Sequence, residues 1–244
     1  MLHLHRQKIR INSLRSYFLF GILILAHTSM AQREMYLSDH DAKPYYFGIT
    51  LGVNLARFHP ELHSRFLQDD SVYTAEPVNS GGFVLGLHAT GRLSDRFQVR
   101  FNPQLMFFQR SILYNLKYPE EDETRITKTV ESVSVSFPIQ VKFQSDRIGN
   151  FRVYMLAGIK GDIDLASNAR AKRAEDLIKI KKYDYGPELG LGFNFFFPSF
   201  IFSPEIKISN GLPNIHSRDA NLKYSSVFDK IQSRMIVFSI HIEG

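Results

Sequence analysis

The sequence predicts an all-β protein, an eight-stranded antiparallel transmembrane β-barrel of the outer-membrane type that follows a cleaved signal peptide. Three observations lead to this prediction. Apolar and polar residues alternate with period two in eight segments, which is the pattern of strands with two different faces. The connections between these segments are alternately long and short, as in outer-membrane barrels. A basic and then apolar leader at the start of the chain indicates export.

The leader has the parts of a secretory signal peptide. Four basic residues and no acidic residue precede an apolar run from Tyr17 to Ala26. The small residues of the sequence S-M-A, which ends at Ala31, then provide a cleavage site. The run of about ten residues is half the length that a membrane-spanning helix needs. We therefore expect a signal peptide over 1–31, a short periplasmic lead-in over 32–43 and an outer-membrane β-barrel domain over 44–244.

Composition excludes several classes of function. Of the 30 basic residues, four lie in 1–31, so the remaining chain has 26 basic and 24 acidic residues. This nearly neutral remainder offers no basic patch for nucleic acid. The chain has no cysteine, which excludes disulfides, thiol catalysis and thiolate metal sites.

The most regular alternation lies between Tyr183 and Ser209. Every second residue from Tyr183 to Phe197 is apolar or aromatic, and the pattern resumes after the dipeptide Pro198-Ser199. Two long strands with about two residues between them form an antiparallel hairpin. If Phe197 pairs with Phe200, Gly192 faces Glu205 and Gly190 faces Lys207. A crowded polar face behind an aromatic face is typical of a small membrane barrel, with lipid outside and a packed polar lumen inside.

The other six strands follow from the same alternation, taken in chain order. We expect them at 44–56, 82–93, 97–110, 127–144, 151–162 and 234–243. Four prolines fall inside predicted strands, where a proline removes a ladder donor, so we expect bulges or positions beyond the lipid. These are Pro103, Pro138, Pro187 and Pro204.

The long connections follow the first, third, fifth and seventh strands, at 59–81, 112–126, 166–180 and 213–231. Outer-membrane barrels have short periplasmic turns, longer extracellular loops and periplasmic termini, so we expect these four loops at the cell surface. Aromatic residues gather near the short turns, where a periplasmic girdle lies. A soluble eight-stranded barrel or sandwich also has many short strands. The regular loop asymmetry and the aromatic band favour the membrane barrel.

An eight-stranded barrel has an interior that side chains fill. We therefore expect the charged residues of the inward faces to form a structural ion network in the lumen, because an unpaired buried charge is costly. The residues of this predicted lumen charge network are Arg92, Arg100, Lys142, Arg152, Lys160, Glu188, Glu205 and Lys207.

Two groups of loop residues have the composition of a metal site or of the catalytic rim of a barrel protease. The first is His59, His63, Asp69 and Asp70, and the second is His216 with Asp219. Such residues in polar loops are usually solvated, and no hydrolase, phosphate-binding or zinc motif is present. We predict no catalytic, cofactor-binding or metal-binding residues, no small-molecule substrate, and a protein that is not an enzyme.

Four stretches give a resemblance to a known family. They are P-Y-Y-F-G-I-T-L-G-V-N-L-A-R-F from Pro44, V-E-S-V-S-V-S-F-P-I-Q-V-K-F from Val130, R-I-G-N-F-R-V-Y-M-L-A-G-I-K-G-D-I-D-L-A-S from Arg147, and Y-G-P-E-L-G-L-G-F-N-F-F-F-P-S-F-I-F-S-P-E-I-K-I-S-N-G-L from Tyr185. These resemble the PorT family, small outer-membrane barrels of the type IX protein secretion system of Bacteroidetes.

The resemblance implies a non-enzymatic role in the export of cargo proteins with C-terminal sorting domains across the outer membrane. The implied partners are outer-membrane lipid and other type IX secretion components, and the implied location is the outer membrane of a Gram-negative cell. The alternative is a small outer-membrane barrel that acts as an adhesin or as a loop-based enzyme unrelated to secretion.

Overall fold

The computed structural model describes residues 34–63, 72–117, 124–167, 179–217 and 227–244. The chain divides into the unit Met1–Met35 and a compact unit, Tyr36–Gly244, which contains all the described strands. Among the described residues, no helix is long and apolar enough to cross a membrane.

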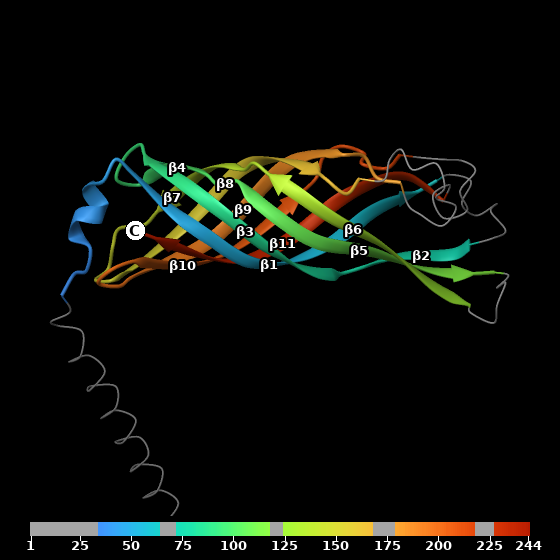
Figure 1. The fold of residues 1–244 in the computed structure, drawn as a ribbon, viewed down its shortest axis with the longest axis horizontal. Coiled ribbons are helices and arrows are strands. Elements are labelled where there is room, and N and C mark those ends of the chain that lie inside the picture. Colours follow the sequence, from blue (N-terminus) through green and yellow to red (C-terminus); the bar gives the residue numbers. More distant parts are fainter. Residues whose placement is uncertain (1–33, 64–71, 118–123, 168–178, 218–226) are drawn as a thin grey trace, which may run out of the picture. The chain divides into compact units, whose positions relative to one another are not determined.

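The described residues of the larger unit form one short 3-10 helix and eleven strands, and every pairing among these strands is antiparallel. The elements are η1 (Ser38–Ala42), β1 (Tyr45–Leu62), β2 (Val72–Val78), β3 (Ser80–Arg92), β4 (Phe97–Phe101), β5 (Gln104–Leu116), β6 (Arg125–Ser136), β7 (Ile139–Gln144), β8 (Phe151–Asp164), β9 (Tyr183–Phe196), β10 (Ile201–Asn210) and β11 (Phe228–Glu243). Their strands wind around a common axis (Figure 1).

The sheet closes on itself, and the predicted eight-stranded barrel is confirmed. β8 pairs with β9 as well as with β6 and β7, which joins the two ends of the sheet. β4 and β5 are two parts of one ring strand, as are β6 and β7, and β2 continues β3 toward the loops, since both pair with β5. The breaks fall at Asn102-Pro103 and Phe137-Pro138, because a proline cannot donate to the ladder.

The other two prolines remain within strands. Pro187 is paired with Ile159 across β8 and β9. At Pro204 the β9–β10 ladder omits the pairs that Ser203 and Pro204 would make, and it resumes at Glu205. The proline therefore acts as a local gap in the ladder without ending the strand.

The predicted hairpin register is confirmed. Gly192 is paired with Glu205 and Gly190 with Lys207, and Phe195 is paired with Phe202. The space above Gly192 is filled by the ring of Tyr154, and a side chain at Gly190 would meet Lys207 Cγ at 2.9 Å.

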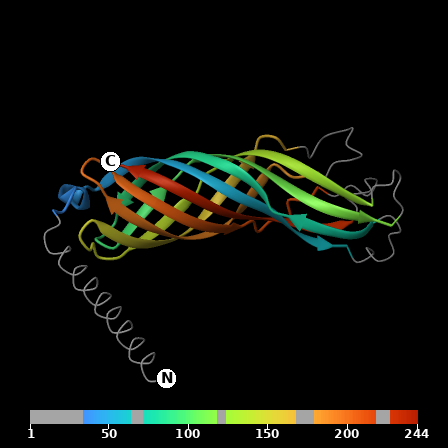
Figure 2. The ribbon, with the colours of Figure 1, turned by 90° about the horizontal axis from the view of Figure 1, so that it is seen from below.

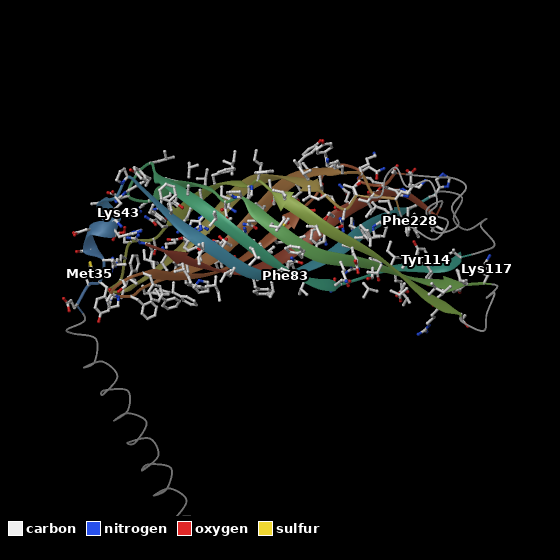
Figure 3. All side chains as sticks on the ribbon, viewed as in Figure 1. Met35, Lys43, Phe83, Tyr114, Lys117 and Phe228 are labelled. Carbon is white, nitrogen blue, oxygen red and sulfur yellow. The ribbon has the colours of Figure 1, made fainter. Side chains whose placement is uncertain are left out.

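The two faces of each strand differ as the alternation predicts. On β1, the exposed fraction is 63% for Phe47 and 57% for Val53, whereas Tyr46 and Thr50 are buried. Apolar side chains project from the outer wall, with Phe83 near its middle (Figure 3). This is the arrangement of a protein whose outer surface meets lipid.

The strand ends correct the predicted loop boundaries. The predicted loops 59–81, 112–126 and 213–231 are too long. β1 reaches Leu62, β2 lies within the first loop, the β5–β6 ladder continues to Asn115 and Arg125, and β11 begins at Phe228. The alternation fades there because outward residues beyond the lipid become polar, while backbone pairing continues. β2, β5 and β6 extend toward the loop end (Figure 2). The parts of the four loops at 64–71, 118–123, 168–178 and 218–226 lie outside the described residues.

A segment that precedes β1 binds the opposite end of the barrel. Its Asp41 forms ion pairs with Arg152 at 2.9 Å and with Arg147 at 3.5 Å. The Arg147 guanidinium also donates to the carbonyl oxygens of Tyr36 and Leu37 and lies over the Phe196 ring. We call residues 36–43 the periplasmic cap, following the rule that the short turns of such barrels face the periplasm.

The first prediction concerns the crowded interior beside Gly192. Replacement of Gly192 by leucine places a side chain where the Tyr154 ring already lies, and we expect a loss of about 1–3 kcal/mol in the free energy of unfolding. Phe193→Leu, on the neighbouring lipid-facing position, is the matched control and leaves stability nearly unchanged. The measurement is the temperature at which the folded form disappears on detergent gels. Equal unfolding temperatures for the two variants would show that the faces are assigned wrongly.

The second prediction concerns His40 in the periplasmic cap. Its ring lies 4.6 Å from the Tyr46 ring, and burial lowers the pKa of His40 below its ordinary value, with Glu243 and Asp41 opposing and Lys43 and Lys142 reinforcing this shift. The docked cap thus favours neutral histidine, so its docking is fully stable above about pH 6.5 and weakens as the pH falls below that value. Hydrogen exchange at the Tyr36 and Lys43 amides, corrected for intrinsic rates, measures the docking.

His40→Phe keeps a ring against Tyr46 but cannot titrate, and it serves as the control. We expect acid to increase exchange in the wild-type cap between about pH 7 and pH 5 and to have little effect in the variant. The same pH dependence in both proteins would contradict the assignment to His40.

Candidate functional site

The barrel interior contains a fully buried ion cluster around Arg100. Its guanidinium contacts Glu205 Oε2 at 2.8 Å and Glu243 Oε1 at 3.3 Å. The hydroxyl of Tyr154 donates to the same Glu205 oxygen at 2.7 Å. The side chains of Arg100, Glu205 and Glu243 have no solvent exposure, so the strength of these pairs is not reduced by screening in water. We call this set, with His88, His241 and Thr50 described next, the central cluster.

A chain of polar contacts joins the two glutamates through Thr50 and two histidines. The Thr50 hydroxyl lies 3.3 Å from His88 Nδ1 and 3.0 Å from His241 Nδ1. Nε2 of His88 lies 3.4 Å from Glu243, and Nε2 of His241 lies 3.3 Å from Glu205. Hydroxyl, imidazole and carboxylate thus follow the order of a hydrolase triad. Thr50 and His241 are completely buried, so the hydroxyl is not exposed to a substrate in this structure.

Three further residues of the predicted lumen charge network lie inside the barrel near this cluster. Lys142 Nζ lies 3.9 Å from the centre of the Tyr154 ring, a cation–π contact. Lys207 Nζ lies 3.9 Å from Glu205 Oε1. Glu188 accepts a hydrogen bond from Gln140 and is buried.

The remaining three predicted residues lie elsewhere. Lys160 pairs with Asp162 at 2.6 Å and is buried. Arg152 pairs with Asp41 of the periplasmic cap. Arg92 pairs at 2.6 Å with Asp95, which is 93% exposed, so Arg92 belongs to a periplasmic turn and not to the lumen. The reason is its place at the last residue of β3, beyond the packed interior.

Sequence reasoning missed most of the acidic partners. The predicted lumen charge network has six cations and two glutamates, which leaves four cations in excess. The structure supplies four acidic partners, and these are Asp41, Asp95, Asp162 and Glu243. The excess of cations in the sequence indicated that further acidic partners exist. Continuing the alternation past His241 would have placed Glu243 on the inward face.

An apolar cluster occupies the interior at the loop end. Tyr114 and Phe228, whose ring centres are 6.1 Å apart, lie toward this end (Figure 3), and both are completely buried. We call the cluster the apolar plug, and its residues are Phe58, Val72, Ile112, Tyr114, Leu116, Val130, Ile180, Ile215, Val227, Phe228 and Ile231. The inward faces of β1, β5 and β6 thus change from polar to apolar as the strands pass toward the loops. With the cap at the other end, both mouths of the barrel are occupied by protein.

Of the loop residues considered for catalysis or metal binding, the structure describes His59, His63 and His216. His59 is exposed near the end of β1, and His216 is buried, with its ring 6.3 Å from that of Phe228. Asp69, Asp70 and Asp219 lie outside the described residues. Within the part of the chain that the structure describes, no group of three or more metal-binding side chains is present.

Comparison with solved structures finds small outer-membrane proteins at low identity. OprG of Pseudomonas aeruginosa is 14% identical, with a TM-score of 0.40, over 80% of this chain and 94% of its own. The outer membrane protease OmpT of Escherichia coli is 9% identical, with a TM-score of 0.42, over 82% of this chain and 97% of its own. Ail, the attachment invasion locus protein of Yersinia pestis, is 9% identical, with a TM-score of 0.37, over 83% of this chain and 100% of its own.

No function is carried over from these proteins, because their similarity is low and they include an enzyme. No curated protein matches the chain. A family model does match, over residues 19–217, and its family is the outer membrane protein beta-barrel domain. This match covers most of the chain and agrees with the closed ring, the apolar outer wall and the packed polar interior. The chain therefore belongs to the outer membrane protein beta-barrel domain family, and its place is the outer membrane.

Proposed function

We propose that this chain is a non-enzymatic outer-membrane component of the type IX protein secretion system of a Bacteroidetes species, needed for the export of cargo proteins across the outer membrane. The observation that carries the proposal is the resemblance to the PorT family in four stretches, which include the β9–β10 hairpin. Membership of the outer-membrane barrel family is consistent with it.

The packed interior supports an accessory role in export. Arg100, Lys142 and Tyr154 are among the largest completely buried side chains, and the apolar plug lies between them and the loops. A barrel of eight strands leaves room for side chains and not for a polypeptide. The cargo would therefore cross through another component, and this barrel would act through its wall, turns or loops.

A contact with other secretion components at the periplasmic side fits the distribution of aromatic residues. Phe197 and Phe200 stack at 5.0 Å at the β9–β10 turn and are 44% and 38% exposed. Exposed aromatics are common at protein interfaces, and they also form the lipid-interface girdle of such barrels. The proposed function therefore includes other secretion components as the partners and the periplasmic side of the barrel as the contact face.

The third prediction tests this function by gene deletion. We expect cargo precursors to accumulate in the periplasm of the deletion strain, because export across the outer membrane stops, while other outer-membrane proteins assemble normally. Fractionation followed by detection of cargo in periplasm and medium is the measurement. Normal amounts of cargo in the medium of the deletion strain would refute the proposal.

Complementation separates the secretion role from the loop-enzyme alternative. The double variant His59→Ala with Asp69→Asn removes side chains that the enzyme alternative needs, and His59 is exposed, so we expect the barrel to fold. The non-enzymatic role requires this variant to restore export as well as the wild-type protein does. Restoration by the wild-type protein alone would favour chemistry at the loops.

A further inference from the structure

β6 extends beyond its neighbour in the ring. On one side it pairs with β5 along its whole length, from Arg125 to Ser136. On the other side it pairs with β8 only from Ser134 to Ser136, because β8 ends at Asp164. One more bond, from the Leu165 amide to the Val133 carbonyl at 2.7 Å, ends this contact. The half of β6 nearer the loops therefore has an edge without a neighbouring strand among the described residues.

The direction of the backbone groups along this edge follows from the register. The Val133 carbonyl accepts from Leu165 and the Phe137 amide donates to Gly161, so odd-numbered residues of this ring strand face β8. The β5–β6 pairing is continuous from Arg125 to Ser136 with no bulge. In an antiparallel ladder the groups facing one neighbour alternate. The amides and carbonyls of Thr127, Thr129 and Glu131 therefore point outward from the edge, and we call these three residues the β6 edge.

The described parts of the chain do not cover the β6 edge. No backbone hydrogen bond between its three residues and another described segment is present apart from the β5 ladder. Beyond Leu165 the chain turns toward β9, since the Ser167 hydroxyl donates to the Ile180 carbonyl at 2.6 Å. Among the described residues, the edge thus has no backbone partner where β8 would otherwise continue.

The surroundings of the edge define the chemistry of an occupant. Thr127, Thr129 and Glu131 expose their side chains on the outer face. On the inner face, Val130 belongs to the apolar plug and Ile126 packs against it. A strand added here would alternate in the same way, with polar residues outside and apolar residues beside Val130. Its backbone would satisfy the row of free amides and carbonyls, which a lipid chain cannot do.

We propose that the β6 edge is a docking site for an extended segment of another protein, with alternating polar and apolar residues, which adds to the barrel as a strand. The partner is recognised through its backbone and through the apolar side chains that it places beside the plug. This inference goes beyond the secretion role and does not depend on it.

The fourth prediction uses substitutions of Thr127. Its amide points away from β5, so Thr127→Pro removes an edge donor without breaking a β5–β6 hydrogen bond. Thr127→Val keeps the amide and the branched shape, and it is the matched control. The measurement is hydrogen exchange at the Thr129 and Glu131 amides, in native outer membranes and in protein purified in detergent. The β5-paired amides of Lys128 and Val130 report whether the strand remains folded.

We expect the Thr129 and Glu131 amides to exchange at least about tenfold more slowly in native membranes than in purified wild-type protein, a difference of about 1.4 kcal/mol. Thr127→Val retains this protection and Thr127→Pro loses it, while Lys128 and Val130 stay protected in both. Slow exchange in the purified protein would mean that the chain covers its own edge, and fast exchange in both preparations would mean that nothing docks. Either result overturns the proposal. A photo-crosslinking residue at position 131 that yields a product of two copies of this chain would also overturn it.

Discussion

The structure depends on the burial of Arg100 between two glutamates inside the barrel. A guanidinium without solvent must have anionic partners, and Glu205 and Glu243 reach it from two neighbouring strands, β10 and β11. Loss of one partner of such a buried pair typically costs about 3–5 kcal/mol. The pairs therefore join β4 to β10 and β11 across the interior, in addition to the backbone ladder. They also fill the space that a pore would need.

The inward faces of the strands are polar in one part of the barrel and apolar in the part toward the loops. Where the outer wall is apolar, the interior is polar, with the central cluster as its core. Toward the loops, the outer face of β6 carries Thr127, Thr129 and Glu131, and the inner face carries Val130 of the apolar plug. The hydrophobic effect explains this exchange, because lipid surrounds the first region and water the second. One part of the barrel thus has the residue distribution of a membrane protein, and the part toward the loops has that of a water-soluble β-barrel.

The fold could be predicted from sequence because period-two alternation fixes which residues face lipid. The hairpin register followed from a short turn and from glycines opposite long side chains at Gly190 and Gly192. The predicted strand ends were less accurate, since β5 and β6 continue as a ladder where the outward residues become polar and no longer mark the lipid-facing side. Two features of the charged residues could not be predicted either. Asp41 comes from a segment outside any strand, and Arg92 looks identical to a lumen residue until its position at a strand end is known.

The central claim is that packed side chains close the barrel, so that its function depends on surfaces and not on passage through the lumen. The most direct test is the electrical conductance of planar bilayers that contain the purified, folded protein. We predict no conductance steps above the leak of the bare bilayer, because the buried side chains of Arg100, Lys142 and Tyr154 fill the interior of this eight-stranded barrel. Reproducible single-channel steps that scale with salt concentration would contradict the claim.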